Sequence, residues 1–304
     1  MFVSFLAALF FALNATCATR NVQAMGSLRA NLGRLMVAAV VLGLFAHTLG
    51  HGFASASVGW FLLSGVIGMG LGDLGVYGAL PLLGSRLTVL MTQCLAAPIA
   101  ALGEWLWLDT RLTPTQMACG SVILGGVALA LVPSKAHPPR VKLRPAGFLL
   151  GFLAAAGQGL GALVSRKGVE VATAAGESAH NATFGLTAAY QRIIAGLAFT
   201  AVWFLVLRLL NWLPQRPTTV IDNQFRHRAY LWLLANGLAG PVLGVGCYQW
   251  ALATTPSGVV LPIVATTPLV AIPIAYFIED ERPSLRSIFG AVVAVGGAVA
   301  LTLA

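Results

Sequence analysis

Charged residues are scarce in this chain of 304 residues: they make up 9% of it, and only nine of them are Asp or Glu. Soluble domains carry about 25% charged residues. This shortage, together with 58% hydrophobic residues, excludes an ordinary soluble domain and indicates a chain whose partner is the lipid bilayer. The net charge of +9 suggests nucleic acid in a soluble protein. Here most basic residues flank apolar segments, so membrane topology explains them and no nucleic-acid partner is expected.

Cysteine is also rare. The four cysteines lie in or beside apolar segments and show no paired spacing, so neither a disulfide framework nor a metal site is predicted. His47 and His51 are four residues apart and share a face of any helix that contains them, but no carboxylate accompanies them. We expect them to be interfacial histidines, and the sequence calls for no cofactor.

Long polar segments are missing as well. A spanning helix needs about 20 predominantly apolar residues, and the sequence divides into ten such segments, which begin near residues 2, 31, 59, 88, 115, 146, 188, 229, 258 and 285. The connections that remain are too short for a soluble catalytic domain. The first segment lacks the basic start of a signal peptide, so we expect it to be retained as a helix.

The chain repeats itself with an offset of 171 residues. The evidence for this repeat comes from Arg, Tyr and paired Gly, because apolar residues often match one another by chance. The positions Gly75, Tyr77, Arg111, Gly125 and Gly126 recur as Gly246, Tyr248, Arg282, Gly296 and Gly297. Two repeats around one path are typical of transporters. We therefore predict an all-α polytopic membrane protein with ten transmembrane helices as two inverted five-helix repeats, 1–133 and 146–304, joined by a basic linker at 134–145.

Basic residues predict the orientation. Fourteen of the 18 Lys and Arg residues lie at connections after odd-numbered segments, and the other four are Arg111, Arg166, Lys167 and Arg192. By the positive-inside rule the odd connections are cytoplasmic, which places both termini outside.

The third segment contains Gly70, Gly72 and Gly75 in the GxGxxG pattern of dinucleotide-binding proteins. That pattern needs a preceding strand and a later acidic residue, whereas here a hydrophobic helix runs through it. We interpret the glycines as helix-packing residues, because small residues three and four apart let helices approach closely in lipid.

Taken together in two copies, these motifs resemble the EamA-like transporter family of the drug/metabolite transporter superfamily. The residues that carry the resemblance are the run 72–80, Pro98, the stretch 104–111, Gly120, Gly125 and Gly126 in the first half, and the run 248–252, Pro268, Glu281, Arg282, Gly290, Gly296 and Gly297 in the second. The resemblance implies a ten-helix carrier with a central cavity that moves small metabolites or drugs, often outward and often with protons. It also implies cytoplasmic termini, contrary to the charge bias, and the orientation stays open.

Ionisable residues inside apolar segments are functional candidates, because a charge is costly in a bilayer. Asp73 is the deepest and either binds a cation or coupling proton or is a structural carboxylate. Glu104, one turn before the end of the fourth segment, either titrates as the helix end opens or snorkels to the headgroups. Arg34 and Arg192, near the start of the second segment of each half, either bind an anionic substrate, lock a gate or anchor the helix at the headgroups.

Neutral polar side chains on the expected cavity helices are further candidates for substrate binding, with interhelical hydrogen bonding as the alternative. They are Tyr77, Gln93, Gln158, Tyr248 and Gln249, together with Asn14, Thr266 and Thr267. Pro98 and Pro268 occupy matching positions in the fourth and ninth segments, and since proline removes a backbone hydrogen bond, we predict that both act as hinges.

The predicted function is a secondary active transporter in the plasma (inner) membrane, an exporter of a small molecule by alternating access with proton coupling. A lipid flippase and a passive channel are alternatives. An intramembrane enzyme is a weaker one, since it would need paired catalytic groups and the single acidic cluster Glu279–Glu281 lies at a segment boundary. A homodimer is left open.

Overall fold

A computed structural model of the chain describes residues 1–132, 143–210, 212, 223–270 and 285–303. Those residues form helices and connections without a strand. Within them, nine helices are long and apolar enough to cross a membrane, and Ser257–Val270 is a shorter apolar helix. The expected ninth segment, which begins near residue 258, continues into 271–284, outside the described residues, and most of the basic linker also lies outside them. The ten-helix inverted arrangement therefore stays a prediction.

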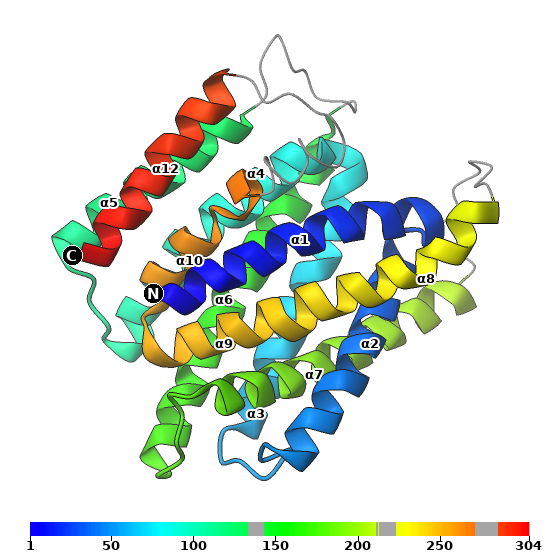
Figure 1. Cartoon of the computed structure of the whole chain (residues 1–304), viewed down its shortest axis with the longest axis horizontal. Coiled ribbons are helices and arrows are strands. Elements are labelled where there is room, and N and C mark those ends of the chain that lie inside the picture. The colour runs from blue at the N-terminus through cyan, green and yellow to red at the C-terminus, as the bar shows by residue number, and fades with distance from the viewer. Residues whose placement is uncertain (133–142, 211, 213–222, 271–284, 304) are drawn as a thin grey trace.

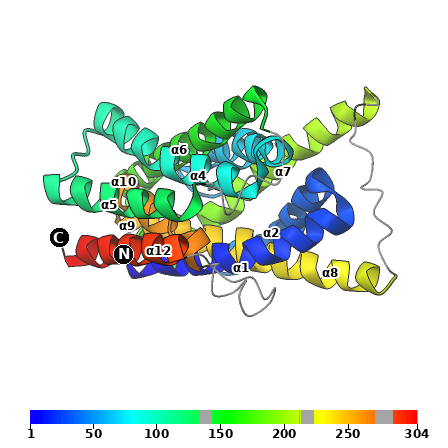
Figure 2. The same cartoon turned by 90° about the horizontal axis from the view of Figure 1, so that it is seen from above.

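The helices follow one another with short connections. Their bounds are α1 (Phe2–Met25), α2 (Ser27–Thr48), α3 (Val58–Gly65), the π-helix η1 (Val66–Gly72), α4 (Asp73–Leu108), α5 (Pro114–Leu131), α6 (Pro145–Ala174), α7 (Ala182–Leu209), α8 (Asn223–Gly237), the π-helix η2 (Leu238–Gly244), α9 (Val245–Thr254), α10 (Ser257–Val264) and α12 (Leu285–Leu303). Figures 1 and 2 show α12 alongside α5 and α1 alongside α8. Helices α4 and α6 pack along each other through the middle of the molecule.

Two expected helix boundaries differ in the structure. The third and fourth segments are joined without a break, because helical backbone continues from α3 through η1 and α4 to Leu108. At 1.5 Å per residue, the 36 residues of α4 would extend about 54 Å, well beyond a hydrocarbon core of about 30 Å. Helix α4 therefore serves parts of two spans, Val58–Ala79 and Leu87–Leu108. Hydropathy failed to show the join because both flanks are equally apolar.

Both halves contain a π-helix at a matching position. Val66–Gly72 and Leu238–Gly244 are each seven residues long, and each is followed directly by an α-helix. Their starting points lie 172 residues apart, one more than the offset of the sequence repeat. π-Helices are rare and occur often at functional sites. The two halves therefore share an irregular backbone conformation as well as residues.

Glycines allow the closest helix crossings. A Cβ atom on Gly75 would lie 2.6 Å from the backbone nitrogen of Ala154, and one on Gly157 would lie 2.5 Å from the Cα atom of Gly72. Gly72 and Gly75 of the GxGxxG pattern thus lie where η1 and α4 pack against α6, as the packing interpretation predicts.

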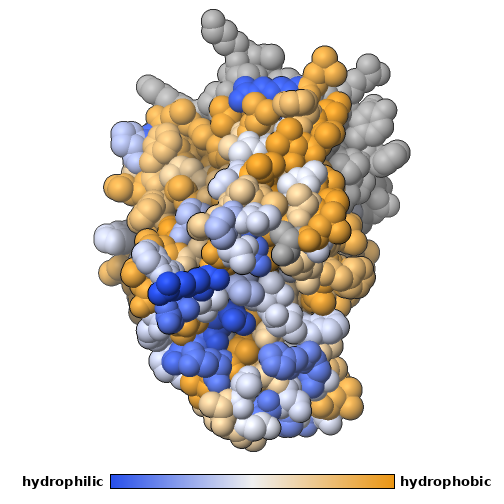
Figure 3. Space-filling model, turned by 90° about the vertical axis from the view of Figure 1, so that its left-hand side faces the viewer, coloured by the Kyte–Doolittle hydropathy of each residue, from blue (hydrophilic) through white to orange (hydrophobic). Residues whose placement is uncertain are grey.

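The surface between the two ends is largely apolar, as a lipid-facing surface requires. Val40, Leu44 and Leu106 are more than 70% exposed, whereas many buried positions are alanines. Figure 3 looks at the left-hand end of Figure 1 and shows hydrophilic side chains gathered over the lower half of that face, with hydrophobic ones above.

The crossing of α5 with α12 provides a test of glycine packing. A Cβ atom on Gly126 would lie 2.6 Å from the nitrogen of Ala294 and 2.7 Å from the carbonyl oxygen of Gly290, while one on Gly125 meets nothing within 4 Å. We expect Gly126→Val to lower the free energy of unfolding by about 1–3 kcal/mol relative to Gly125→Val, because overpacking forces the helices apart. Thermal unfolding of both variants in detergent measures this difference, and equal unfolding temperatures would contradict it.

Candidate functional site

An ion pair between α2 and α4 lies inside the helix bundle. Arg34 donates from Nη2 to Asp73 Oδ2 at 2.6 Å and from Nε to Asn31 Oδ1 at 2.8 Å. The two charged side chains are 12% and 20% exposed, and Asn31 is fully buried. Helix α2 begins at Ser27, four residues earlier than its predicted start, so Arg34 lies two turns inside it. Arg34 is therefore a mostly buried charge with a carboxylate partner.

Arginine and tyrosine meet in the same way in both halves. The Arg34 guanidinium lies 5.9 Å from the ring centre of Tyr77, and that of Arg192 lies 6.0 Å from the ring centre of Tyr248. Tyr77 and Tyr248 are related by the repeat, and each arginine comes from the second helix of its half. The structure thus brings together five of the predicted residues as two matching pairs, with Asp73 in electrostatic reach of both arginines.

The two pairs differ in charge balance. Arg192 in α7 is only 4% exposed, yet within the described residues it makes neither a hydrogen bond nor an ion pair, and its Nε is fully buried without a partner. The position related to Asp73 by the 171-residue offset is Gly244. The second half therefore has the arginine and the tyrosine but no equivalent carboxylate.

A second ion pair, near the end of α4, joins helices of the two halves. Glu104, 1% exposed, accepts hydrogen bonds from Arg166 Nε at 3.0 Å and from the backbone nitrogen of Ser257 at 2.9 Å. Arg166 in turn donates from Nη1 to the carbonyl oxygen of Leu252 at 2.6 Å. The carboxylate thus lies at the N-terminus of α10 and the guanidinium at the C-terminal turn of α9, each where the helix dipole favours its charge. We call this arrangement the Glu104–Arg166 clasp.

The remaining polar candidates divide into paired and unpaired groups. Gln158 on α6 donates to Gln93 on α4 at 3.0 Å, which links the two halves. The Tyr248 hydroxyl and both amide atoms of Gln249 are buried and have no hydrogen-bond partner in the described structure. The same holds for Asn14 Oδ1, which lies against Gly240 of η2.

The two predicted hinge prolines have different surroundings. Pro98 is exposed, and α4 runs through it without a break. Pro268 follows an interruption of the helix at Ala265 and Thr266, and because proline has no N–H, it cannot bond to the carbonyl of Val264. The Thr267 hydroxyl donates to that carbonyl at 2.6 Å instead. The hinge roles of both prolines stay predictions.

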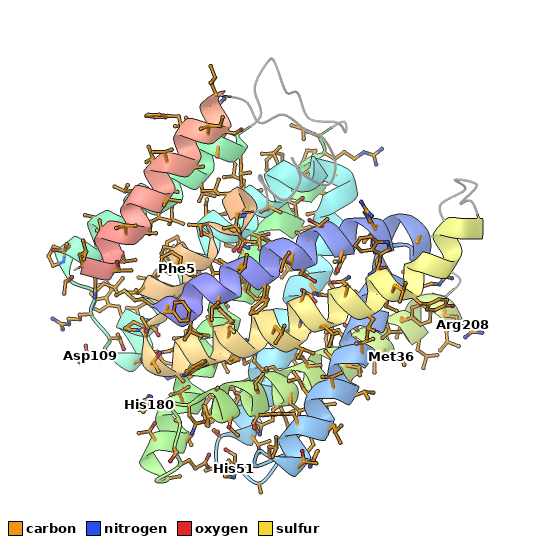
Figure 4. The ribbon with its side chains drawn as sticks, in the orientation of Figure 1. Phe5, Met36, His51, Asp109, His180 and Arg208 are labelled. Atoms are coloured by element: carbon orange, nitrogen blue, oxygen red, sulfur yellow. The ribbon has the colours of Figure 1, made fainter. Side chains whose placement is uncertain are left out.

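The connections lie at opposite ends of the bundle. Figure 4 places Asp109 and His180 at one end and Arg208, in the last turn of α7, at the other. His51 lies at the lower edge of that view, near the first end. His47 bonds to Tyr190 at 3.2 Å, and no group of three metal-ligating side chains occurs in the described part of the chain.

Sequence reasoning missed the residues that complete these networks, namely Asn31, Arg166 as a clasp residue, and Ser257. A span of about 20 residues from the predicted start of the sixth segment near residue 146 ends before Arg166, whereas α6 continues to Ala174. Arg166 is therefore an interior helix residue. A search for Arg and Glu within one turn of apolar segment ends would have singled out both clasp residues, though not their pairing.

The model of the EamA-like transporter family matches residues 1–132 and 145–303. No curated protein matches the chain. Twenty-nine solved chains match it. One of them, a crystal structure of a protein with 18% sequence identity, covers 99% of this chain over 96% of its own length with a TM-score of 0.72. At that identity, the likeness shows a shared fold.

The clasp provides a stability test. We expect Glu104→Gln and Arg166→Gln each to lower the free energy of unfolding by about 3 kcal/mol, because each leaves a buried charge without its partner. The double variant should lose at least about 1 kcal/mol less than the sum of the two. Thermal unfolding of the four proteins in detergent gives this coupling, and strictly additive losses would show that the pair makes no net interaction.

Proposed function

The chain belongs to the EamA-like transporter family, and we propose that it is a secondary carrier that exports a small metabolite or drug-like compound by alternating access. The family and the nine apolar helices make it a multi-pass integral membrane protein of a kind that moves small molecules. The direction, the plasma (inner) membrane and the coupling to protons are parts of the proposal.

The meeting of the two arginine–tyrosine pairs around Asp73 is the observation that carries the proposal. A carrier needs a polar site between its two halves which each side of the membrane reaches in turn. Arg34 and Tyr77 come from the first half and Arg192 and Tyr248 from the second. Arg34 forms an ion pair with Asp73, and Arg192 lies within electrostatic reach of the same carboxylate. Charges buried in a bilayer persist where function requires them.

The clasp supplies the gate in this proposal. It joins α4 of the first half to α6, α9 and α10 of the second, beside the end of the bundle marked by Asp109 and His180 in Figure 4. An ion pair can break when both partners become hydrated, so the clasp holds this end closed until water enters. Opening of the opposite end then requires no change in the clasp.

Asp73 is the proposed coupling residue. Among the described residues, it forms an ion pair with Arg34 alone, at 2.6 Å. Protonation of the carboxylate would break that pair and free the Arg34 guanidinium. Proton binding and release at this pair therefore change the charge of the central site, which is what coupling to a proton gradient requires.

Asp73→Asn tests the proposal. Compounds that accumulate outside cells overproducing the protein identify a substrate, which is then studied in proteoliposomes. We expect Asp73→Asn to abolish uphill flux driven by a pH gradient while substrate exchange continues, because exchange needs binding and access but no net proton movement. The control is Asp109→Asn, since Asp109 caps the same helix with its side chain 85% exposed.

Two results would contradict this account. Undiminished uphill flux in Asp73→Asn would remove the coupling role, and flux that rises without saturation in the wild-type protein would indicate a channel.

A further inference from the structure

The charge at the centre of the bundle identifies a substrate class. We propose, on the basis of the carrier function above, that the transported compound is a small organic monoanion whose negative group binds Arg192, with an apolar body beside it.

Arg192 has no counter-charge of its own. Its side chain is 4% exposed, its Nε has no partner, and within the described residues it takes part in no hydrogen bond and no ion pair. Removing an ion from water costs several kcal/mol unless a partner compensates it. Arg34, at the corresponding place in the first half, has Asp73 and Asn31, and Arg166 has Glu104 and the Leu252 carbonyl. Of these three arginines, Arg192 is the one whose guanidinium is available to bind a ligand.

The charge count favours one negative charge. Arg34 and Asp73 neutralise each other at 2.6 Å, and Asp73 reaches Arg192 only through a longer electrostatic interaction. The site therefore carries one excess positive charge. A monoanion balances it, a dianion leaves a negative charge unpaired, and a cation is repelled.

Two glycines face the Arg192 guanidinium. A Cβ atom on Gly68 would lie 2.8 Å from Arg192 Nη2, and one on Gly161 would lie 3.4 Å from it. A side chain at Gly68 would collide with the guanidinium, so the buried charge depends on glycine there. The Tyr248 hydroxyl, which is also buried without a partner, supplies a second donor beside it.

The buried side chains packed around Tyr248 are apolar, and several of them are alanines. Tyr248 packs in one cluster with Ala96, Ala97, Ala100 and Ala162, and its ring meets that of Phe11 edge to face at 6.3 Å. A guanidinium and a hydroxyl at one side of an alanine-lined region suit a compound with one anionic group and an apolar body.

A set of size-matched probes tests the class by calorimetry on the purified protein. Benzoate, benzamide and benzylamine differ in charge on one ring, and 4-carbamoylbenzoate and terephthalate compare one charge with two. We expect benzoate to bind about tenfold more tightly than benzamide, since a hydrogen bond to a charged group is the stronger, and benzylamine not to bind. We expect 4-carbamoylbenzoate to bind more tightly than terephthalate.

Variants assign the preference to Arg192. Arg192→Gln should bind benzoate no better than benzamide, and Arg192→Lys should keep part of the preference. Arg208→Gln removes an exposed arginine from the far end of the same helix and should bind as the wild type does. Without ligand, Arg192→Gln should unfold at the same temperature as the wild type or higher, because it removes an uncompensated buried charge.

Several results would overturn the inference: no benzoate binding, equal affinity for benzoate and benzamide, tighter binding of terephthalate, or a preference retained in Arg192→Gln. A marked loss of stability in Arg192→Gln would also do so, by showing that the residue is structural. If cells overproducing the protein export neutral or cationic compounds, the carrier function stands and the monoanion class falls. If they export nothing, the carrier function itself falls.

Discussion

An ionised side chain inside a bilayer must be neutralised close by, and the positions of the interior charges follow from this constraint. Asp73 is compensated by Arg34, and Glu104 by Arg166 and the N-terminus of α10. Each pair joins helices that are distant in sequence, so the charges also determine which helices meet. The ion pairs are therefore both the polar interior of the protein and the fixed points of its packing.

The exception is Arg192, and the exception follows from a difference between the halves. The repeat preserves arginine and tyrosine in both halves, while the position of Asp73 is taken by Gly244 in the second. Perfectly matched halves would leave two balanced ion pairs and no excess charge. Because Gly244 has no carboxylate, Arg192 keeps its charge without an ion-pair partner among the described residues.

Glycine makes this interior possible. The crossings of η1 and α4 with α6 depend on Gly75 and Gly157, where even a methyl group would collide with backbone. The two π-helices lie directly before Asp73 and Val245. Their altered hydrogen-bond register rotates the following helix, which is why a hydropathy pattern with a period of 3.6 residues cannot place the side chains of α4 or α9.

Composition and hydropathy were enough for the class of the protein and for most helix positions, because apolar length is a local property of the sequence. The repeat also related Tyr77 to Tyr248, and in the structure each of them lies near an arginine. The sequence could not predict the two ion pairs. Arg34 contacts Asp73, 39 residues away, and Glu104 contacts Arg166, 62 residues away. They depend on how helices cross, and glycine contacts and π-helices control those crossings.

The central claim is alternating access. It is tested most directly by the distance between the two halves at the end of the bundle where the Glu104–Arg166 clasp lies. Arg111 and Ser178 are exposed at the connections after α4 and α6. The four native cysteines are first replaced, and cysteines introduced at these two positions carry spin labels. Double electron–electron resonance between the labels then measures the distance between the halves. We expect one short distance in the otherwise native protein and an added longer population in Glu104→Gln. The same single distance in both proteins, under conditions where substrate is exchanged, would contradict the account.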